Sequence, residues 1–315
     1  MKPHLIVNPA SANGRTGRQF DRVARAVREA LGEFDCTFTR RRGDAVLAAR
    51  ALARDGADLV VAVGGDGTAS EVIDGLSGDG GTPRPGPVFG YIPCGTGGDL
   101  ARTLGYPLEP AAAARVLSGH ALRTIDLGRI QFTAHDGSPA VRCFANVAGA
   151  GISGLVVRHV ERMGKALGGR ATFMLGAGRA LIGWRDRRVR WRVDGDPWRE
   201  DPITALCVCN GRFFGGGMMV APGARVDDGL LDVTLWQGLG FGDFVLRRGM
   251  LYDGSHVRLR NTRTFRARVV EVAPLEEEPV LLDVDGEQPG VLPARFEVVP
   301  GVLRVHAGAA KVRSG

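Results

Sequence analysis

Two patterns of apolar and polar positions divide the chain near residue 125. In the first part, short apolar runs alternate with amphipathic segments whose apolar residues recur at helical spacing. The run Asp58–Val63 is almost continuously apolar, as expected of a strand that is buried on both faces of a parallel sheet. The predicted strands are His4–Asn8, Cys36–Thr39, Asp58–Val63 and Val88–Ile92, and the predicted helices are Arg18–Leu31, a helix capped by Asp44 that stops at Gly56, Thr68–Leu76 and a helix from Asp99. This alternation predicts a doubly wound α/β domain that binds ligands at the carboxyl ends of its strands.

Strand-like runs dominate from about Thr124 onward. Turn signals such as Asp194-Gly195 separate them, and two helical stretches interrupt them, around Leu155–Trp184 and Phe241–Tyr252. The predicted strands are Arg142–Val147, Arg187–Val193, Ile203–Cys209, Leu230–Trp236, Thr264–Val272, Val280–Val284 and Arg295–Val299. We therefore expect an α/β domain over residues 1–125 and a β-rich domain, sandwich-like or barrel-like, over residues 126–315. The pattern leaves open whether the tail from about residue 300 to 315 returns to the first domain.

Composition is that of a globular protein with a default location in the cytoplasm. The 315 residues suffice for two domains, and no apolar run approaches the eighteen or so residues that a membrane-spanning helix needs. The first residues lack the apolar core of a signal peptide. The five cysteines are scattered and form no CxxC pair, which favours buried free thiols over a zinc site.

Glycine content and net charge both suit a partner that carries phosphate. Glycine supplies 47 of the 315 residues, so many loops can let their backbone approach a ligand closely. The net charge is +7, and a basic surface attracts nucleotides, nucleic acid or anionic lipid. No recognised nucleic-acid-binding module is present, so we expect no nucleic-acid partner.

The segment Gly64-Gly65-Asp66-Gly67-Thr68 lies between a buried strand and a helix. Glycines at such a place let backbone N–H groups approach phosphate oxygens, and the helix amino terminus adds partial positive charge. An acid inside an anion-binding loop indicates a Mg²⁺ or water ligand beside a nucleotide, or else a residue that caps a helix. The segment is neither a Walker loop nor a GxGxxG fingerprint.

Two more loops of this kind follow predicted strands. Pro93–Asp99 contains three glycines and Thr96, and its Asp99 is placed either to cap the next helix or to bind a ligand. Asn8–Gly14 follows the first strand. Three polar, glycine-containing loops at the ends of parallel strands predict one crevice that binds a nucleotide.

The order and spacing of four motifs resemble those of diacylglycerol kinases and soluble bacterial lipid kinases. The motifs are Asn8-Pro9-x-Ser11, Gly64-Gly65-Asp66-Gly67-Thr68, Pro93-x-Gly95-Thr96-Gly97-x-Asp99 and Asp285-Gly286-Glu287. The resemblance covers essentially the whole chain. It implies an ATP-dependent kinase whose ATP contacts are Asn8, Thr39, Gly64, Gly65, Asp66, Gly67, Thr68, Ala69, Ser70, Glu71, Gly95 and Thr96.

The resemblance also implies a metal loop and a general base in the second domain. The metal, Mg²⁺, is expected on Asp228 and the main-chain carbonyls of Arg225 and Leu230, although a plain Asp-Gly turn would explain the same residues. Glu287 is expected to take the proton from the lipid hydroxyl that attacks the γ-phosphate, with Asp66 and Asp285 as further catalytic carboxylates.

One departure and one basic stretch affect the acceptor side. Similar kinases commonly have Asn before the aspartate that corresponds to Asp99, whereas this chain has Gly98. The stretch Leu155–Trp184 places Arg158, Arg162, Lys165, Arg170 and Arg179 among apolar residues, which suits either peripheral contact with the inner face of a membrane or packing on the protein's own core.

The leading hypothesis is phosphorylation of diacylglycerol or a related membrane glycerolipid. The alternatives are a sphingoid-base or ceramide kinase, a NAD kinase, and a non-catalytic regulator that binds nucleotide or lipid. Which lipid is used and the oligomeric state cannot be deduced from the sequence.

Overall fold

The chain forms two compact units. The structure is a computed structural model that describes residues 2–78, 86–163 and 169–307. Unit 1 comprises Met1–Ile125 and Gly301–Gly315, and unit 2 comprises Asp126–Pro300. Within the described residues, no helix is both long and apolar enough to cross a bilayer. Lys165 and the side chain of Arg170, which belong to the basic stretch, lie outside the described part of the chain.

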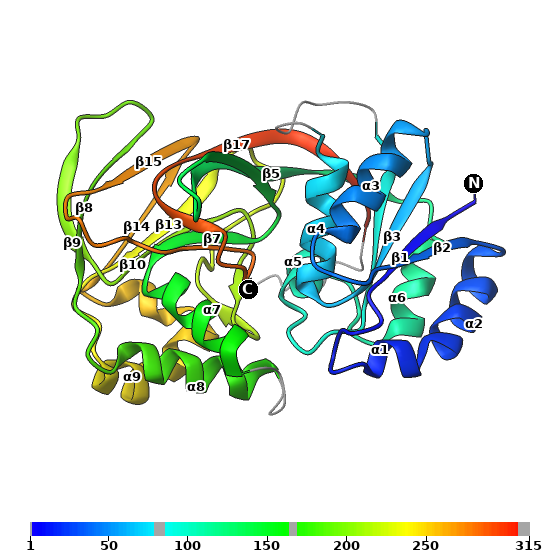
Figure 1. Ribbon diagram of the computed structural model, residues 1–315, viewed down its shortest axis with the longest axis horizontal. Coiled ribbons are helices and arrows are strands. Elements are labelled where there is room, and N and C mark those ends of the chain that lie inside the picture. The colour runs from blue at the N-terminus through cyan, green and yellow to red at the C-terminus, as the bar shows by residue number, and fades with distance from the viewer. Residues whose placement is uncertain (1, 79–85, 164–168, 308–315) are drawn as a thin grey trace. The chain divides into compact units, whose positions relative to one another are not determined.

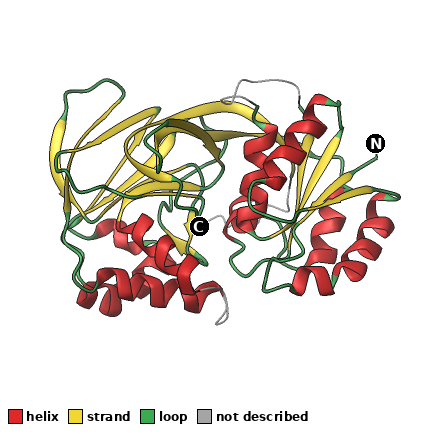
Figure 2. Ribbon diagram, viewed as in Figure 1, coloured by secondary structure: helices red, strands yellow, loops and turns green. Residues whose placement is uncertain are grey.

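Unit 1 is a parallel sheet with helices on both of its faces (Figures 1 and 2). In spatial order the strands are β2 (Asp35–Phe38), β1 (His4–Val7), β3 (Leu59–Gly64), β4 (Val88–Pro93) and the last residues of β17 (Gly290–His306). Each neighbouring pair is parallel. Every residue of β3 and β4 is buried, as expected of central strands that are covered on both sides. The prediction of a doubly wound α/β unit is confirmed.

The helices of unit 1 differ from the predicted ones mainly at their ends. They are α1 (Arg15–Arg18), α2 (Phe20–Leu31), α3 (Asp44–Arg54), α4 (Asp66–Leu76), α5 (Asp99–Leu104) and α6 (Pro110–Leu117). The sequence analysis missed α6, where Glu109 accepts hydrogen bonds from Ala111 N and Ala112 N. Asp44 is the first residue of α3 and not its cap, because its carboxylate binds the N–H groups of Arg40 and Arg41 in the preceding turn.

Unit 2 is a β-sandwich, so the β-rich prediction is also confirmed. One sheet has the order β14 (Thr262–Ala267), β13 (Leu231–Trp236), β10 (Ala205–Cys209), β7 (Val147–Gly151) and β16 (Leu282–Val284). The other consists of β17, β15 (Val269–Pro274), β8 (Arg187–Val193) and β9 (Arg199–Ile203), together with β5 (Leu122–Ala134) and β6 (Pro139–Phe144) beside β17. A short hairpin of β11 (Phe213–Phe214) and β12 (Met218–Met219) stands apart. Apolar side chains of both sheets, among them Phe144, Trp191, Leu206 and Phe296, form one core.

Three strands that the sequence predicts as continuous are each broken in two. The chain changes from one sheet of the sandwich to the other between β6 and β7, between β9 and β10, and between β14 and β15. At the first of these corners Ala145, Asn146 and Val147 donate their N–H groups to the carboxylate of Asp285. At the third, Arg268 N and Val269 N donate to Asp194. Side-chain acceptors thus satisfy backbone groups that a continuous strand would pair within its ladder.

A helical layer covers the five-stranded sheet of unit 2 on the side away from the sandwich core. It consists of α7 (Ile152–Met163), α8 (Gly169–Leu181), α9 (Phe241–Asp253) and the 3₁₀ turn η1 (Ser255–Arg258). These helices pack on β7, β10 and β13 through a second apolar cluster that includes Val156, Cys207 and Trp236. The apolar side of α7 is therefore directed to the protein's own core, whereas membrane contact by this stretch stays a prediction.

The last strand, β17, contributes to both units. Its first part pairs antiparallel with β15, and its Val305 pairs in parallel with Phe89 of β4. In unit 1 the carbonyl of His306 accepts a hydrogen bond from the Tyr106 hydroxyl at 3.2 Å, and Ala307 N donates to Ala121 O at 2.8 Å. Residues 301–307 therefore complete the unit that is otherwise built from the amino-terminal part of the chain.

Candidate functional site

The three polar loops of unit 1 lie together at the carboxyl ends of β1, β3 and β4. The amide of Asn8 donates to Thr68 Oγ1 at 3.1 Å, which joins the first loop to the second. The second and third loops are joined by Cys94 N and Gly95 N, which donate to Gly64 O at 2.7 and 3.1 Å. The structure therefore brings the three predicted nucleotide loops into one place.

Two glycines let the second and third loops approach each other. A Cβ atom added to Gly95 would lie 2.4 Å from the Cα atom of Gly65, a separation that no folded chain tolerates. Gly95 and Thr96 are exposed, and Gly65 and Gly67 are half-buried. The exposed backbone at this junction is therefore available to a ligand, as close-approach glycines in phosphate-binding loops are.

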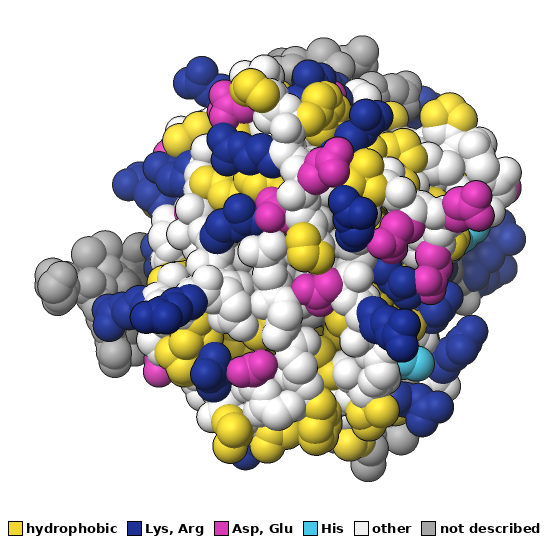
Figure 3. Space-filling model, turned by 90° about the vertical axis from the view of Figure 1, so that its left-hand side faces the viewer, with side chains coloured by type: hydrophobic (Ala, Val, Ile, Leu, Met, Phe, Trp, Pro, Cys, Tyr) yellow, Lys and Arg dark blue, Asp and Glu magenta, His cyan; other side chains and the backbone are white. Residues whose placement is uncertain are grey.

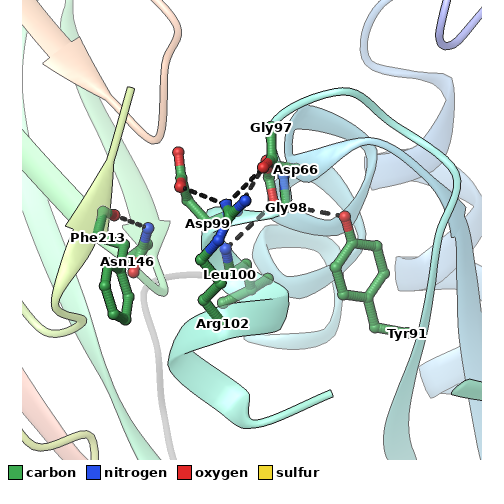
Figure 4. Close-up of polar contacts among 9 residues, drawn as sticks. All are labelled: Asp66, Tyr91, Gly97, Gly98, Asp99, Leu100, Arg102, Asn146 and Phe213. Carbon is green, nitrogen blue, oxygen red and sulfur yellow. Dashed lines mark hydrogen bonds and ion pairs between the residues drawn. The ribbon is translucent and has the colours of Figure 1, made fainter. Parts of the chain in front are cut away.

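Asp66 caps the helix that follows the third loop (Figure 4). Its Oδ2 accepts hydrogen bonds from Gly98 N at 2.7 Å and Asp99 N at 3.2 Å. Its Oδ1 accepts from Leu100 N at 3.1 Å and from the Tyr91 hydroxyl at 3.4 Å. The carboxylate thus satisfies amides at the amino terminus of α5, where negative charge is also favoured by the helix dipole.

Asp99 does not cap α5, contrary to one of its two predicted roles. It is the first helical residue, and its carboxylate forms an ion pair with Arg102 at 3.0 Å. Gly98 is the residue before the helix and has a φ of 71°, in the left-handed region that favours glycine. A Cβ atom at this position would also lie 2.6 Å from Leu108 Cδ2, so an asparagine could not occupy Gly98 without a local shift.

The remaining predicted ATP contacts fall into two groups. Asn8 is half-buried, whereas Thr39, Gly64, Thr68, Ala69 and Ser70 are buried. Glu71 accepts hydrogen bonds from Gly43 N at 3.1 Å and Ala45 N at 3.3 Å, so its carboxylate holds the start of α3. The buried residues therefore shape the loops and do not face a ligand. The accessible residues are Asn8, Gly65, Gly67, Gly95 and Thr96.

In unit 2, Asp285 and Gly286 form the turn that presents Glu287. Both have positive φ, 48° and 83°, as the two central residues of a type I′ hairpin turn do. Val284 and Glu287 flank the turn and exchange backbone hydrogen bonds of 2.8 and 3.0 Å. The Asp285 carboxylate accepts three backbone N–H groups at 3.0 to 3.1 Å, which anchors the turn to the corner between β6 and β7.

The side chain of Glu287 is held by an arginine that the sequence analysis did not single out. Arg142 Nη1 lies 2.7 Å from Glu287 Oε2, and both side chains are largely buried. On the other side of the turn, Asp283 Oδ1 accepts the N–H of Gly286 at 2.9 Å. Burial raises the pKa of Asp283 to about 8. A neutral carboxyl next to the turn leaves Asp285 and Glu287 with one fewer negative neighbour.

The expected metal loop offers oxygen donors of the kind that divalent cations prefer. Asp228 Oδ1 accepts the N–H of Leu230 at 3.2 Å, and Asp228 Oδ2 is paired with Arg266. Arg266 also lies 3.4 Å from Asp232 Oδ2, a buried atom that has no hydrogen-bond partner within the described part of the chain, and burial raises the pKa of Asp232. The described residues contain no cluster of three or more metal-binding side chains, so a cation here would depend on main-chain carbonyls as well. These residues fit Mg²⁺, which would compete with Arg266 for Asp228.

An apolar cavity of about 100 Å³ lies within unit 2, between the helical layer and the five-stranded sheet. Its walls include Val156, Phe173, Ala177, Trp236, Phe244 and Leu251. The hydroxyls of Ser153 and Thr262, which also line it, are buried and have no hydrogen-bond partner among the described residues. The cavity therefore suits an apolar chain that carries a hydrogen-bonding group.

Comparison with known proteins identifies the family. Residues 2–130 match the family model of the diacylglycerol kinase catalytic domain, and residues 146–307 match the YegS C-terminal NAD kinase beta sandwich-like domain. A protein of Xanthomonas euvesicatoria pv. vesicatoria (strain 85-10), named "Probable lipid kinase YegS-like", is 33% identical over 303 residues, which cover 93% of this chain and 94% of that protein. The chain belongs to the YegS-like lipid kinase family.

Other relatives of this lipid kinase agree with that assignment. A diacylglycerol kinase of Mycobacterium tuberculosis (strain ATCC 25618 / H37Rv) is 34% identical over 260 residues, which cover 82% of this chain and 79% of that protein. The crystal structure of a candidate diacylglycerol kinase from Bacillus anthracis str. Sterne matches with a TM-score of 0.78 at 25% identity and covers 98% of this chain and 96% of that one. The resemblance drawn from the four motifs is confirmed, and the protein is an enzyme of a kinase family, which uses a nucleotide and usually a divalent metal.

Two residues of this lipid kinase that hold predicted site residues in place were not predicted from the sequence. Tyr91 is fully buried in β4, and burial together with the charge of Asp66 raises the pKa of its hydroxyl well above the usual value. Arg142 lies in β6, an otherwise mostly apolar strand. In both cases the sequence shows a polar side chain within an apolar strand, which suggests a buried contact. It does not show that the contacted residues are Asp66 and Glu287.

Proposed function

We propose that this lipid kinase transfers the γ-phosphate of ATP to a hydroxyl of a membrane glycerolipid such as diacylglycerol. The apolar cavity of unit 2 is the observation that supports the lipid part of the proposal. Its walls match the acyl chain of a lipid and do not match a polar, water-soluble acceptor. Membership in the lipid kinase family carries the kinase part.

The accessible loop residues of unit 1 are proposed to hold the nucleotide. Backbone N–H groups around Gly65 and Gly67 would bind phosphate oxygens, and the Thr96 hydroxyl would add one donor. Gly95 would contribute by letting the two loops approach each other closely. Asp66 contributes by fixing α5 and the third loop in position. Phosphoryl transfer needs little covalent help from the protein, so accurate positioning of the phosphates accounts for much of the rate.

Glu287 is proposed as the general base. The ion pair with Arg142 at 2.7 Å fixes the orientation of its carboxylate. The proton of the lipid hydroxyl would pass to a Glu287 oxygen as the hydroxyl oxygen attacks the γ-phosphorus. The bond between the γ-phosphorus and the β–γ bridging oxygen would break in the same step, and its electron pair would leave with ADP. Asp285 supports this step by anchoring the turn through its three N–H contacts.

Mg²⁺ is the proposed metal, because the chain offers oxygen ligands. It would be held by Asp228 with the carbonyls of Arg225 and Leu230, and when bound it would supply positive charge. Arg266 pairs with one Asp228 oxygen and is 45% exposed, so it can move into solvent when a cation binds.

The acceptor is proposed to reach the cavity from a bilayer through α9. None of the thirteen residues of α9 is buried, and Leu246 is 85% exposed, with Phe241 and Val245 about half exposed. Figure 3 shows hydrophobic side chains along the lower edge of its view, on the side of unit 2 where Figure 1 places α9. A loosely packed amphipathic helix with exposed arginines suits contact with anionic lipid and opens at low cost.

The deciding experiment is incubation with labelled ATP, Mg²⁺ and each of four acceptors: diacylglycerol, phosphatidylglycerol, sphingosine and NAD. We expect label in diacylglycerol or phosphatidylglycerol. Label in sphingosine would replace the glycerolipid acceptor by a sphingoid base, and label in NAD alone would overturn the lipid assignment. Glu287→Gln should reduce lipid phosphorylation by about 10² to 10⁴-fold with ATP affinity unchanged.

Glu200→Gln is the matched control, because Glu200 lies on the exposed face of β9 with a side chain that is 59% exposed. The cavity is tested separately by a diacylglycerol with brominated acyl chains, which should quench the fluorescence of Trp236. Quenching that persists in Trp236→Phe would show that the chain binds elsewhere.

A further inference from the structure

A second cavity of unit 2, of about 440 Å³, is lined by arginines and is separate from the apolar one. Its walls come from α7, the carboxyl end of α8 with the residues that follow, β8 and the segment before β16. Arg158, Arg185 and Arg187 line it together with Trp184 and Glu278. Three arginines against one acid give it a positive charge.

Two hydrogen-bond donors at this cavity are left without a partner. Arg158 Nε and Trp184 Nε1 are buried atoms, and among the described residues neither has a hydrogen-bond acceptor. Buried donors are almost always paired in native proteins, because an unpaired one loses its hydration without compensation. The helix dipole favours arginine side chains near the carboxyl terminus of α8. It does not account for two buried donors that lack a hydrogen-bond acceptor among the described residues.

One arginine of the cavity, Arg187, is paired with a carboxylate of the protein itself. Both terminal nitrogens of Arg187 donate to the two carboxylate oxygens of Glu278, the paired geometry that arginine also offers to phosphate. Glu278 is 60% exposed, whereas Arg187 is only 20% exposed. An exposed carboxylate on a more buried guanidinium is a ligand that an external anion can displace.

The rim of the cavity carries an exposed apolar side chain. Ile182, at the rim of the cavity, is 70% exposed. An exposed apolar side chain beside an arginine cluster is typical of a surface that meets lipid headgroups.

We propose that this arginine pocket binds a phosphate group, either in the headgroup of an anionic phospholipid or as free phosphate. Arg158, Arg185 and Arg187 would supply the positive charge, and the Trp184 indole a further donor. Glu278 would leave Arg187 when the phosphate binds. The pocket shares no side chain with the proposed nucleotide and metal residues, and binding to it requires no phosphoryl transfer.

The test measures binding of the full chain without ATP. One arm uses vesicles of phosphatidylcholine with and without phosphatidylglycerol, and the other uses inorganic phosphate against chloride at equal ionic strength, followed by Trp184 fluorescence and thermal unfolding. Arg185→Gln should weaken binding about tenfold, the loss expected for one charge-assisted contact. The control Arg188→Gln makes the same charge change at a β8 residue that is 63% exposed and should weaken binding less than about twofold.

A gain-of-binding variant guards against loss of folding. Glu278→Gln removes the internal competitor and should tighten phosphate binding several-fold, whereas the neighbouring Glu277→Gln should not. Binding to anionic vesicles without an effect of inorganic phosphate assigns the pocket to a lipid headgroup, and an effect of phosphate alone assigns it to the free ion. Equal behaviour of Arg185→Gln and Arg188→Gln in both arms would overturn the proposal.

Discussion

Replacing Asp66 by asparagine separates a role in positioning from a role in chemistry. The carboxylate accepts four hydrogen bonds, two on each oxygen. An asparagine side chain keeps one oxygen for Gly98 N and Asp99 N and turns an NH₂ group toward Leu100 N and the Tyr91 hydroxyl. The hydroxyl can accept from this group, but the bond of Leu100 N is lost and the remaining bonds no longer have a charged acceptor. Hydrogen bonds to a charged group contribute about 1.5 to 3 kcal/mol each, so we expect Asp66→Asn to destabilise unit 1 by about 3 kcal/mol or more.

Thermal unfolding and ATP binding provide the assay. A loss of about 3 kcal/mol lowers the Tm of a unit of this size by roughly 10 °C, and ATP affinity should fall with it because the third loop is no longer held. Asp55→Asn, at an exposed site after α3, should stay within about 0.5 kcal/mol of wild type. An Asp66→Asn protein that unfolds and binds ATP like wild type yet has no kinase activity would refute the positioning role and return Asp66 to the chemistry.

Three other predictions concern Asp283, Gly95 and Arg266. Because burial raises the pKa of Asp283 from 3.8 to about 8, the folded protein holds a proton that the unfolded chain releases between those values, and stability falls as pH rises through that range. Between pH 6 and pH 9 this group should lower the free energy of unfolding by about 3 kcal/mol, and Asp283→Asn should abolish that decrease. Urea unfolding at several pH values measures it. A variant with the same pH dependence as wild type would contradict the assigned burial. Gly95→Ala should abolish detectable ATP binding, since its Cβ would lie 2.4 Å from Gly65 Cα; ATP titration of the folded variant checks this, and normal affinity would argue against the close approach. Arg266→Gln should tighten Mg²⁺ binding at Asp228 by about tenfold in calorimetry, while an unchanged affinity would mean that the cation does not use this carboxylate.

The fold was predictable from the sequence to the extent that local pattern determines it. The alternation of apolar runs with amphipathic segments predicted the parallel sheet, and Asp58–Val63 was correctly predicted as a strand that is buried on both faces. The glycine segment after this run does lie at the end of that strand. The corners of the sandwich were not predictable, because an apolar alternation continues through a residue at which the chain changes sheets. At Arg268 the corner is stabilised by Asp194, which lies 74 residues away along the chain, so no local signal marks it.

The same distinction holds for the candidate site. Motif spacing predicted Asp66, Asp285 and Glu287 as catalytic residues, which stays a prediction, but it did not show that Asp66 caps α5 or that Asp285 anchors a sheet corner. Tyr91 contacts Asp66 from the buried strand β4, and Arg142 contacts Glu287 from the partly exposed strand β6. Each is a single polar residue in its strand, and the sequence does not show which distant group it contacts. Contacts made across the fold determine these roles, and one sequence alone does not contain them.

Because the end of β17 belongs to unit 1, this unit cannot complete its folding until the ribosome has synthesised nearly the whole chain. Val305 completes the edge of the parallel sheet beside β4, and His306 accepts the hydrogen bond of the buried Tyr106. The first 125 residues therefore emerge without their final strand and must wait, exposed to chaperones and proteases, until all of unit 2 has been synthesised. A nonsense mutation shortly before residue 301 would consequently damage unit 1, which is proposed to bind the nucleotide, although every codon of its glycine loops is intact.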